Sequence, residues 1–221
     1  MPAPTPPGVF VTGTGTGVGK TVVAAALART AAAADRRVAV FKPAVTGLDE
    51  LPGPADHELL RSAADSPQSD QEIAPYRFGP PASPHLAAAM AGVEIEPARL
   101  RAVAAAAASG AELLVCEGVG GLLVPLAPDY LVRDLAADLG YPVVVAAAPG
   151  LGTINHTLLT VEAARAAGLE VAAVVLTPWP DAPTEIERSN REAIARLGRV
   201  EVRSLPPLDL RTPDVWPPLI L

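Results

Sequence analysis

The most informative stretch of this chain is Val9-Phe10-Val11-Thr12-Gly13-Thr14-Gly15-Thr16-Gly17-Val18-Gly19-Lys20-Thr21. An apolar run typical of a strand leads into a glycine-rich turn, then Gly-Lys-Thr, then an Ala-rich run typical of a helix. This order is that of a phosphate-binding P-loop, in which backbone N–H groups and the helix N-terminus surround phosphate oxygens. In such a loop the lysine, here Lys20, reaches the β- and γ-phosphates, and the Thr21 hydroxyl can bind Mg²⁺.

The spacing departs from the strict P-loop pattern at one position. The pattern places a glycine five residues before Gly19, and Thr14 stands there, between Gly13 and Gly15. A glycine- and threonine-rich loop without a ligand is the alternative, but the order of the elements favours phosphate binding. The residues expected to hold nucleotide phosphates are Gly15, Thr16, Gly17, Val18, Gly19, Lys20 and Thr21.

Composition limits the kind of protein that this chain can be. Its 221 residues are enough for one sizeable α/β domain and too few for two comfortable ones. A net charge of −7 without a basic cluster argues against nonspecific binding to nucleic acid or to an anionic membrane. The one cysteine, Cys116, excludes an internal disulfide and a thiolate zinc site. We find no signal peptide and no apolar run of membrane-spanning length, so we expect a soluble cytoplasmic protein.

Short Val-rich runs alternate with Ala-rich runs along the chain. Because the predicted strands are apolar throughout, we expect them to be buried on both faces. The pattern predicts a single α/β domain of P-loop NTPase type, with a mostly parallel sheet and helices on both faces. The predicted strands are Val9–Thr12, Val38–Lys42, Glu112–Glu117, Val143–Ala147, Val171–Thr177 and Val200–Ser204. The predicted helices are Lys20–Ala34, His57–Ala64, Pro97–Ala108, Leu131–Leu139, Ile154–Ala167 and Thr184–Leu197.

The domain is expected to span residues 8–205, with proline-rich segments at 1–7 and 206–221. The C-terminal segment contains five prolines and cannot form a long helix. Segment 65–84, rich in Pro, Ser, Asp and Gln, is predicted to be a long surface loop.

Ligands of parallel α/β sheets bind at the carboxyl ends of the strands, so the polar residues there are candidates for the site. Lys42 ends one strand and can place a second cation over a transferring phosphoryl group; its alternative is an ordinary surface lysine. Asp56 can cap the helix that begins at His57, serve a metal or nucleotide, or do both. Glu117 ends an apolar strand next to several glycines and suits a Mg²⁺ ligand; its alternative is a carboxylate that faces water.

A second glycine-rich turn, 148–156, leads from a strand into a helix N-terminus. Its N–H groups can hold a carboxylate, and the alternative is a routine turn capped by Thr153. Neither His57 nor His85 has a partner visible in the sequence, and His156 is predicted to be a helix-surface or capping residue.

Five motifs together resemble the dethiobiotin synthetase family, from about residue 8 to about residue 205. They are Gly-Thr-Gly-Thr-Gly-Val-Gly-Lys-Thr at 13–21, Lys-Pro-Ala-Val-Thr-Gly at 42–47, Asp56, Glu-Gly-Val-Gly-Gly-Leu-Leu-Val-Pro at 117–125 and Gly-Thr-Ile-Asn-His-Thr at 152–157. The resemblance implies a homodimer with active sites at the subunit interface. It also implies formation of dethiobiotin from 7,8-diaminopelargonate, CO₂ and ATP through a carbamate and a carbamic–phosphoric anhydride.

The resemblance also implies roles for individual residues. Lys42 and Lys20 would be the catalytic cations, and Thr21, Asp56 and Glu117 the ligands of Mg²⁺. The nucleotide would also contact Glu117, Thr177 and Pro206. The substrate would be bound by Thr16, Lys42, Thr46 and Gly121, and its carboxylate by Gly152, Thr153, Ile154 and Asn155 of the neighbouring subunit.

Some positions depart from the family pattern. Gly15 and Gly17 stand where the family often has acidic residues, and the usual adenine-reading Asn after the strand ending at Thr177 is replaced by Pro178-Trp179-Pro180. The C-terminal segment lacks the closing helix that the family leads us to expect.

Two other classes share this type of fold. Partitioning ATPases carry a lysine five residues before the P-loop lysine, and that position here is Gly15. Glutamine-dependent amidases of corrinoid synthesis need a second domain with a nucleophilic cysteine, for which the chain has no room.

Overall fold

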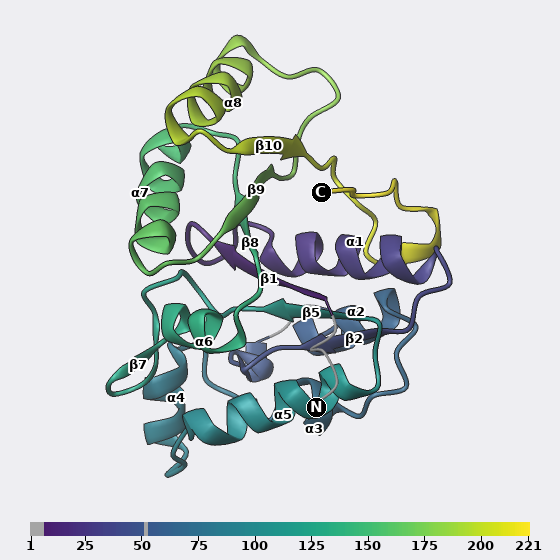
Figure 1. Ribbon diagram of the computed structural model, residues 1–221, viewed down its shortest axis with the longest axis vertical. Helices are drawn as coiled ribbons and strands as arrows, with labels where there is room; N and C mark the ends of the chain where they lie inside the picture. Colours follow the sequence, from purple (N-terminus) through teal and green to yellow (C-terminus); the bar gives the residue numbers. More distant parts are fainter. Residues whose placement is uncertain (1–6, 51–52) are drawn as a thin grey trace.

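A computed structural model of the chain describes residues 7–50 and 53–221, so most of the predicted proline-rich segment 1–7 lies outside the described residues. Its centre is a parallel sheet of six strands in the order β10-β9-β8-β1-β5-β2 (Figure 1). The strands are β1 (Gly8–Gly13), β2 (Val38–Phe41), β5 (Leu113–Glu117), β8 (Val143–Ala147), β9 (Val171–Leu176) and β10 (Glu201–Ser204). The predicted α/β fold with a parallel sheet is therefore confirmed.

Helices cover both faces of this sheet, as predicted (Figure 1). One face packs against α1 (Lys20–Ala32), α2 (Asp56–Ala63) and α3 (Asp70–Ile73). The other packs against α5 (Pro97–Ser109), α6 (Val132–Leu139), α7 (Thr153–Ala166) and α8 (Glu185–Gly198).

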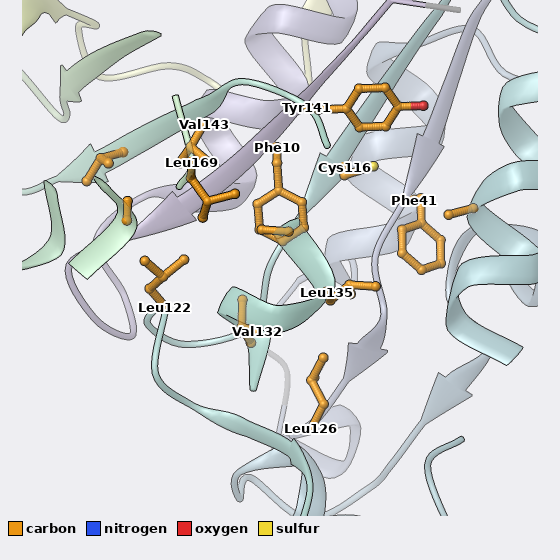
Figure 2. Close-up of a cluster of buried hydrophobic side chains, with 14 of the residues drawn as sticks. Phe10, Phe41, Cys116, Leu122, Leu126, Val132, Leu135, Tyr141, Val143 and Leu169 are labelled. Atoms are coloured by element: carbon orange, nitrogen blue, oxygen red, sulfur yellow. The ribbon is translucent and has the colours of Figure 1, made fainter. Parts of the chain in front are cut away.

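The cluster under the second group of helices contains the large side chains of the core. Figure 2 shows Phe10 and Phe41, from β1 and β2, in one cluster with Val132 and Leu135 of α6. Cys116 belongs to the same cluster and is fully buried, so it is a core residue. Burial raises the pKa of its thiol.

The prediction of a surface loop over residues 65–84 was wrong. The segment contains α3, the short strand β4 (Tyr76–Arg77) and the first residue of α4 (Pro84–Met90). It covers the open edge of β2: the Gln68 side-chain amide donates to Val40 O and accepts from Val40 N, and Lys42 N donates to Ile73 O. An uncovered edge strand would leave these backbone groups unpaired, which explains why so polar a segment is ordered.

The remaining differences concern short elements and element ends. Asp56 begins α2, whereas the sequence suggested a start at His57, and β2 ends at Phe41 instead of Lys42. The short elements that the sequence did not reveal are β3 (Ala44–Val45), η1 (Leu48–Glu50), β4, α4, β6 (Pro125–Ala127), β7 (Tyr130–Leu131) and η2 (Pro213–Val215). None of the described helices is long and apolar enough to cross a membrane.

The C-terminal segment 206–221 has only the 3₁₀ turn η2, so the predicted absence of a closing helix is confirmed. It runs beside α1 (Figure 1), where Trp216 and Leu208 pack against the cluster formed by α1 and α2. Leu219 is 5% exposed, and its N–H donates to the Thr30 hydroxyl at 2.8 Å. An irregular segment thus covers part of this face.

Replacing Leu219 by alanine tests this packing. We expect Leu219→Ala to lower the free energy of unfolding by about 2 kcal/mol, because it removes a buried side chain. The adjacent Ile220 is 66% exposed, so Ile220→Ala is the matched control and should change stability by less than about 0.5 kcal/mol. Urea denaturation of both variants measures the difference; equal effects would contradict the packing.

Candidate functional site

A cavity of about 660 Å³ lies where β1, β2 and β5 end. It is the position at which parallel α/β sheets bind ligands. The sequence-predicted site residues that line it are Thr16, Gly17, Gly19, Lys20, Thr21, Lys42, Thr46, Asp56 and Glu117.

The glycine-rich loop after β1 forms one wall of this cavity. Gly17 and Gly19 have positive φ angles of 73° and 87°, which side chains other than glycine rarely adopt. A Cβ atom at Gly19 would also lie 2.5 Å from the methyl group of Thr177. The loop therefore requires glycine at this position for two independent reasons.

Lys20 begins α1 and lies across the loop. Its Nζ donates to the carbonyl oxygen of Gly15 at 2.6 Å, and the residue is only 8% exposed. Burial lowers the pKa of Lys20, while the nearby carboxylate of Glu117 acts in the opposite direction. The lysine and the loop thus form a compact structure with a cation at its centre, which suits an anion.

Lys42 is almost completely buried, at 2% exposed, between two carboxylates. Its Nζ lies 2.6 Å from Glu117 Oε1 and 2.9 Å from Asp56 Oδ2. Burial alone would lower the pKa of Lys42, but Glu117 and Asp56 outweigh it, so the pKa lies above its usual value. The site thus holds a charged ammonium group in a fixed place.

The two carboxylates respond differently to this environment. Burial raises the pKa of Glu117, which is 0% exposed, although Lys42 opposes that rise. Burial also acts to raise the pKa of Asp56, but the charge of Lys42 prevails and the pKa is lowered. Both carboxylates lie next to the same ammonium group, so the deeper burial of Glu117 accounts for the opposite directions of the two pKa shifts.

The oxygen atoms around Lys42 fit a magnesium site that is completed by phosphate and water. The Thr21 hydroxyl lies 2.9 Å from Glu117 Oε1 and 3.0 Å from Asp56 Oδ1. Glu117 Oε2 is buried and has no hydrogen-bond partner within the described part of the chain. Mg²⁺ prefers a few protein oxygens together with phosphate oxygens and waters. Among residues 7–50 and 53–221 there is no cluster of three or more His, Cys, Asp or Glu side chains that could hold a metal alone.

The geometry removes the alternative interpretations of three residues. Lys42 is not a surface lysine, and Glu117 does not face water. Asp56 is not a helix cap, because the N-cap position is Ala55, whose N–H is bonded by the Glu58 carboxylate.

Another part of the cavity lining is largely apolar, and the sequence did not reveal it. It comprises Ala44, Pro81, Ala82, Ser83, Pro84, Val119, Gly120 and Val124. Ser-Pro at the start of a helical run is a helix-start signal that could have located α4. Leu210, from the C-terminal segment, also lines the cavity.

Several predicted site residues lie outside the cavity lining. Thr177 is 3% exposed and packs its methyl group against Gly19, and Trp179 packs against the cluster under α5–α8. A Cβ atom at Gly121 would lie 3.6 Å from Gly13 O, so this glycine approaches the P-loop backbone. The others outside are Gly15, Val18, Gly152, Thr153, Ile154, Asn155 and Pro206.

The second glycine-rich turn connects β8 to α7 next to the P-loop strand. Gly152 has a φ of 89°, and the first bond within α7 runs from His156 N to Gly152 O, so the N–H groups of Ile154 and Asn155 precede it. The Thr153 side chain is buried against Thr157, which leaves only its backbone for a ligand. Leu151, at the tip of the turn, is 98% exposed.

A solved structure with this fold is distant in sequence. The crystal structure of the signal recognition particle 54 kDa protein from Aeropyrum pernix K1, in complex with GDP, superposes with a TM-score of 0.50 at 14% identity. The superposed region covers 92% of this chain and 42% of the signal recognition particle protein. At this identity the similarity concerns the fold alone.

Sequence relatives are much closer. A family model described as an AAA domain matches residues 7–213. The ATP-dependent dethiobiotin synthetase BioD of Anaeromyxobacter dehalogenans strain 2CP-1 is 46% identical over 94% of this chain and 92% of its own length. The proteins of the same name from Rhodococcus erythropolis and Bacillus subtilis strain 168 are 43% and 36% identical, each over 90% of this chain and 87% of their own length. The chain belongs to the dethiobiotin synthetase family.

Proposed function

We propose that this protein is an ATP-dependent dethiobiotin synthetase, a ligase that forms C–N bonds. It carboxylates 7,8-diaminopelargonate with CO₂ and closes the ureido ring, releasing ADP and phosphate. The observation that carries the proposal is the ammonium group of Lys42, held 2.6 Å from Glu117 and 2.9 Å from Asp56 beside a P-loop. Relatives of that name, matched over most of their length, support it.

The chemistry asks for charge and position more than for a protein base. One substrate amine captures CO₂ as a carbamate, whose oxygen attacks the γ-phosphate to give a mixed anhydride. The second amine then attacks the carbonyl carbon and expels phosphate. Phosphoryl transfer is accelerated chiefly by alignment and by neutralisation of negative charge.

The residues of the cavity suit these steps. Lys20 would bind the β- and γ-phosphates with the N–H groups of residues 15–21, and Lys42 would stabilise the negative charge that is transferred. Thr21, Asp56 and Glu117 would hold Mg²⁺, which would neutralise further phosphate charge. The unpartnered Glu117 Oε2 is available for this role.

The substrate would lie along the largely apolar part of the cavity lining. Lys42, Thr46, Thr16 and Gly121 would contact the carbamate end. The apolar residues, including Ala44, Pro81, Val119 and Val124, suit an aliphatic chain.

The carboxylate end would be bound by Gly152, Thr153, Ile154 and Asn155 of a second subunit in a homodimer. This turn lies outside the cavity of its own chain, and its tip carries the exposed Leu151. The cytoplasmic location expected from the sequence stays a prediction.

A direct assay tests the proposed reaction. The protein is incubated with 7,8-diaminopelargonate, bicarbonate, Mg²⁺ and ATP, and the product is identified by mass spectrometry. Dethiobiotin is expected. Hydrolysis of ATP without dethiobiotin would refute the proposal and favour a nucleotide-switched binding protein.

Replacing Lys42 separates binding from turnover. We expect Lys42→Ala to lower kcat by about 10²-fold or more, because it removes a cation that acts as charge is transferred. Nucleotide should still bind, since Lys20 and the loop N–H groups remain. Steady-state rates and calorimetric titration with ATP measure the two effects. A variant with near-normal kcat would contradict the catalytic role of Lys42.

Mixing two impaired variants tests whether each active site is shared between two subunits. Lys42→Ala and Asn155→Ala chains should each be impaired alone, because each spoils both sites of its homodimer. In a mixed dimer one site would combine an intact Lys42 with an intact Asn155, so part of the activity should return. No recovery after subunits have exchanged, or a fully active monomer by light scattering, would exclude a shared site.

Weak discrimination among nucleotide bases is also expected. Thr177 has one hydroxyl and is buried against Gly19, so it offers no paired donor and acceptor to adenine. CTP, GTP and UTP should therefore support the reaction within about tenfold of ATP in kcat/KM, about 1.4 kcal/mol. Parallel assays decide this, and a preference of several hundredfold for ATP would mean that other residues read the base.

A further inference from the structure

Asn190, on α8, is a buried polar residue that the proposed mechanism does not use. It is 7% exposed, and its Nδ2 donates to the carbonyl oxygens of Pro149 at 2.9 Å and Gly150 at 3.1 Å. Both acceptors belong to the turn between β8 and α7. A side chain distant in sequence therefore fixes two successive peptide groups of this turn.

These two hydrogen bonds, together with the bond from Thr153 N to Gly150 O at 3.3 Å, fix the directions of the neighbouring N–H groups. In a trans peptide the N–H is directed opposite to the C=O. The carbonyls of Pro149 and Gly150 face Asn190, so the N–H groups of Gly150 and Leu151 point away from α8. The first N–H groups of α7, those of Ile154 and Asn155, follow shortly after them in the chain and have no acceptor in the helix.

We propose that Asn190 is a positioning residue, which orients this turn for the carboxylate of the substrate bound in the partner's cavity. The inference rests on the proposed function of the turn. Asn190 does not touch the substrate; it holds two carbonyl groups away from an anion bound at the N–H groups and the Asn155 side chain. Without Asn190 the Gly150 carbonyl would keep its bond from Thr153 N, but the Pro149 carbonyl could turn toward the anion and repel it.

A purely structural role in joining α7 to α8 is the alternative. The two helices have a second connection that is independent of Asn190: Arg165, near the end of α7, donates to Gly198 O at 2.6 Å and to Arg199 O at 3.0 Å. Removing Asn190 thus leaves the helix pair connected at its other end. The turn, by contrast, loses both side-chain donors.

Kinetics of matched variants distinguish the two roles. Asn190→Ala should raise KM for 7,8-diaminopelargonate about tenfold, as expected for loss of buried hydrogen bonds, with KM for ATP and kcat little changed. Asn190→Ser can keep one donor and should give a smaller rise in the same KM. Ser189→Ala, at an exposed neighbour on α8, should match the wild type. Arg165→Ala should lower Tm without changing KM for the diamine.

The possible outcomes distinguish a failure of this inference from a failure of the proposed function. If the wild type makes no dethiobiotin, the proposed function fails. If the wild type is active and folded Asn190 variants keep its KM for the diamine, the positioning role alone is overturned. Equal rises in both KM values, or a fall in Tm of the same size as in Arg165→Ala with no change in KM, would indicate a structural role. If the alanine variant does not fold, the milder serine variant decides.

Discussion

The buried ammonium group of Lys42 is the interaction on which the rest of the site depends. A charge with 2% exposure is tolerated only because two carboxylates lie within 2.9 Å of it. Removing both carboxylates would leave the ammonium charge uncompensated in a region of low dielectric. Lys42, Glu117 and Asp56 therefore form one electrostatic unit, which brings β2, β5 and α2 together at the P-loop.

The register of the sheet produces this arrangement. Phe41 of β2 pairs with Cys116 of β5, so the next residues, Lys42 and Glu117, emerge side by side at the carboxyl edge. Glu117 in turn pairs with Val11 of β1, shortly before the P-loop begins. A shift of one residue in either pairing would turn the lysine or the carboxylate away from the phosphate site. The hydrophobic cores on the two faces fix that register, and thereby the site.

The sequence predicted the elements whose signal is local. Continuous apolar runs located the strands, and Lys42 and Glu117 were found because they end such runs. Lys20 was found because it follows the glycine-rich loop in Gly-Lys-Thr. The order of segment 65–84 was missed because it comes from Gln68 and Ile73 bonding to β2, and such contacts leave no periodic pattern. Asn190 was missed for a related reason, since its partners lie in an element distant in the chain. The irregular C-terminal segment was predicted as non-helical, but its packing at Leu219 was not foreseen.

In the proposed mechanism a carbamate oxygen attacks the γ-phosphate beside Lys42. The most direct test follows the oxygen of ¹⁸O-labelled CO₂ and bicarbonate through one turnover, in a reaction that is short compared with exchange of this oxygen with water. Mass spectrometry of the released phosphate should show one ¹⁸O atom, and dethiobiotin should keep the other in its ureido carbonyl. Phosphate without the label would show that water, not the carbamate, attacks the nucleotide, and would contradict the account.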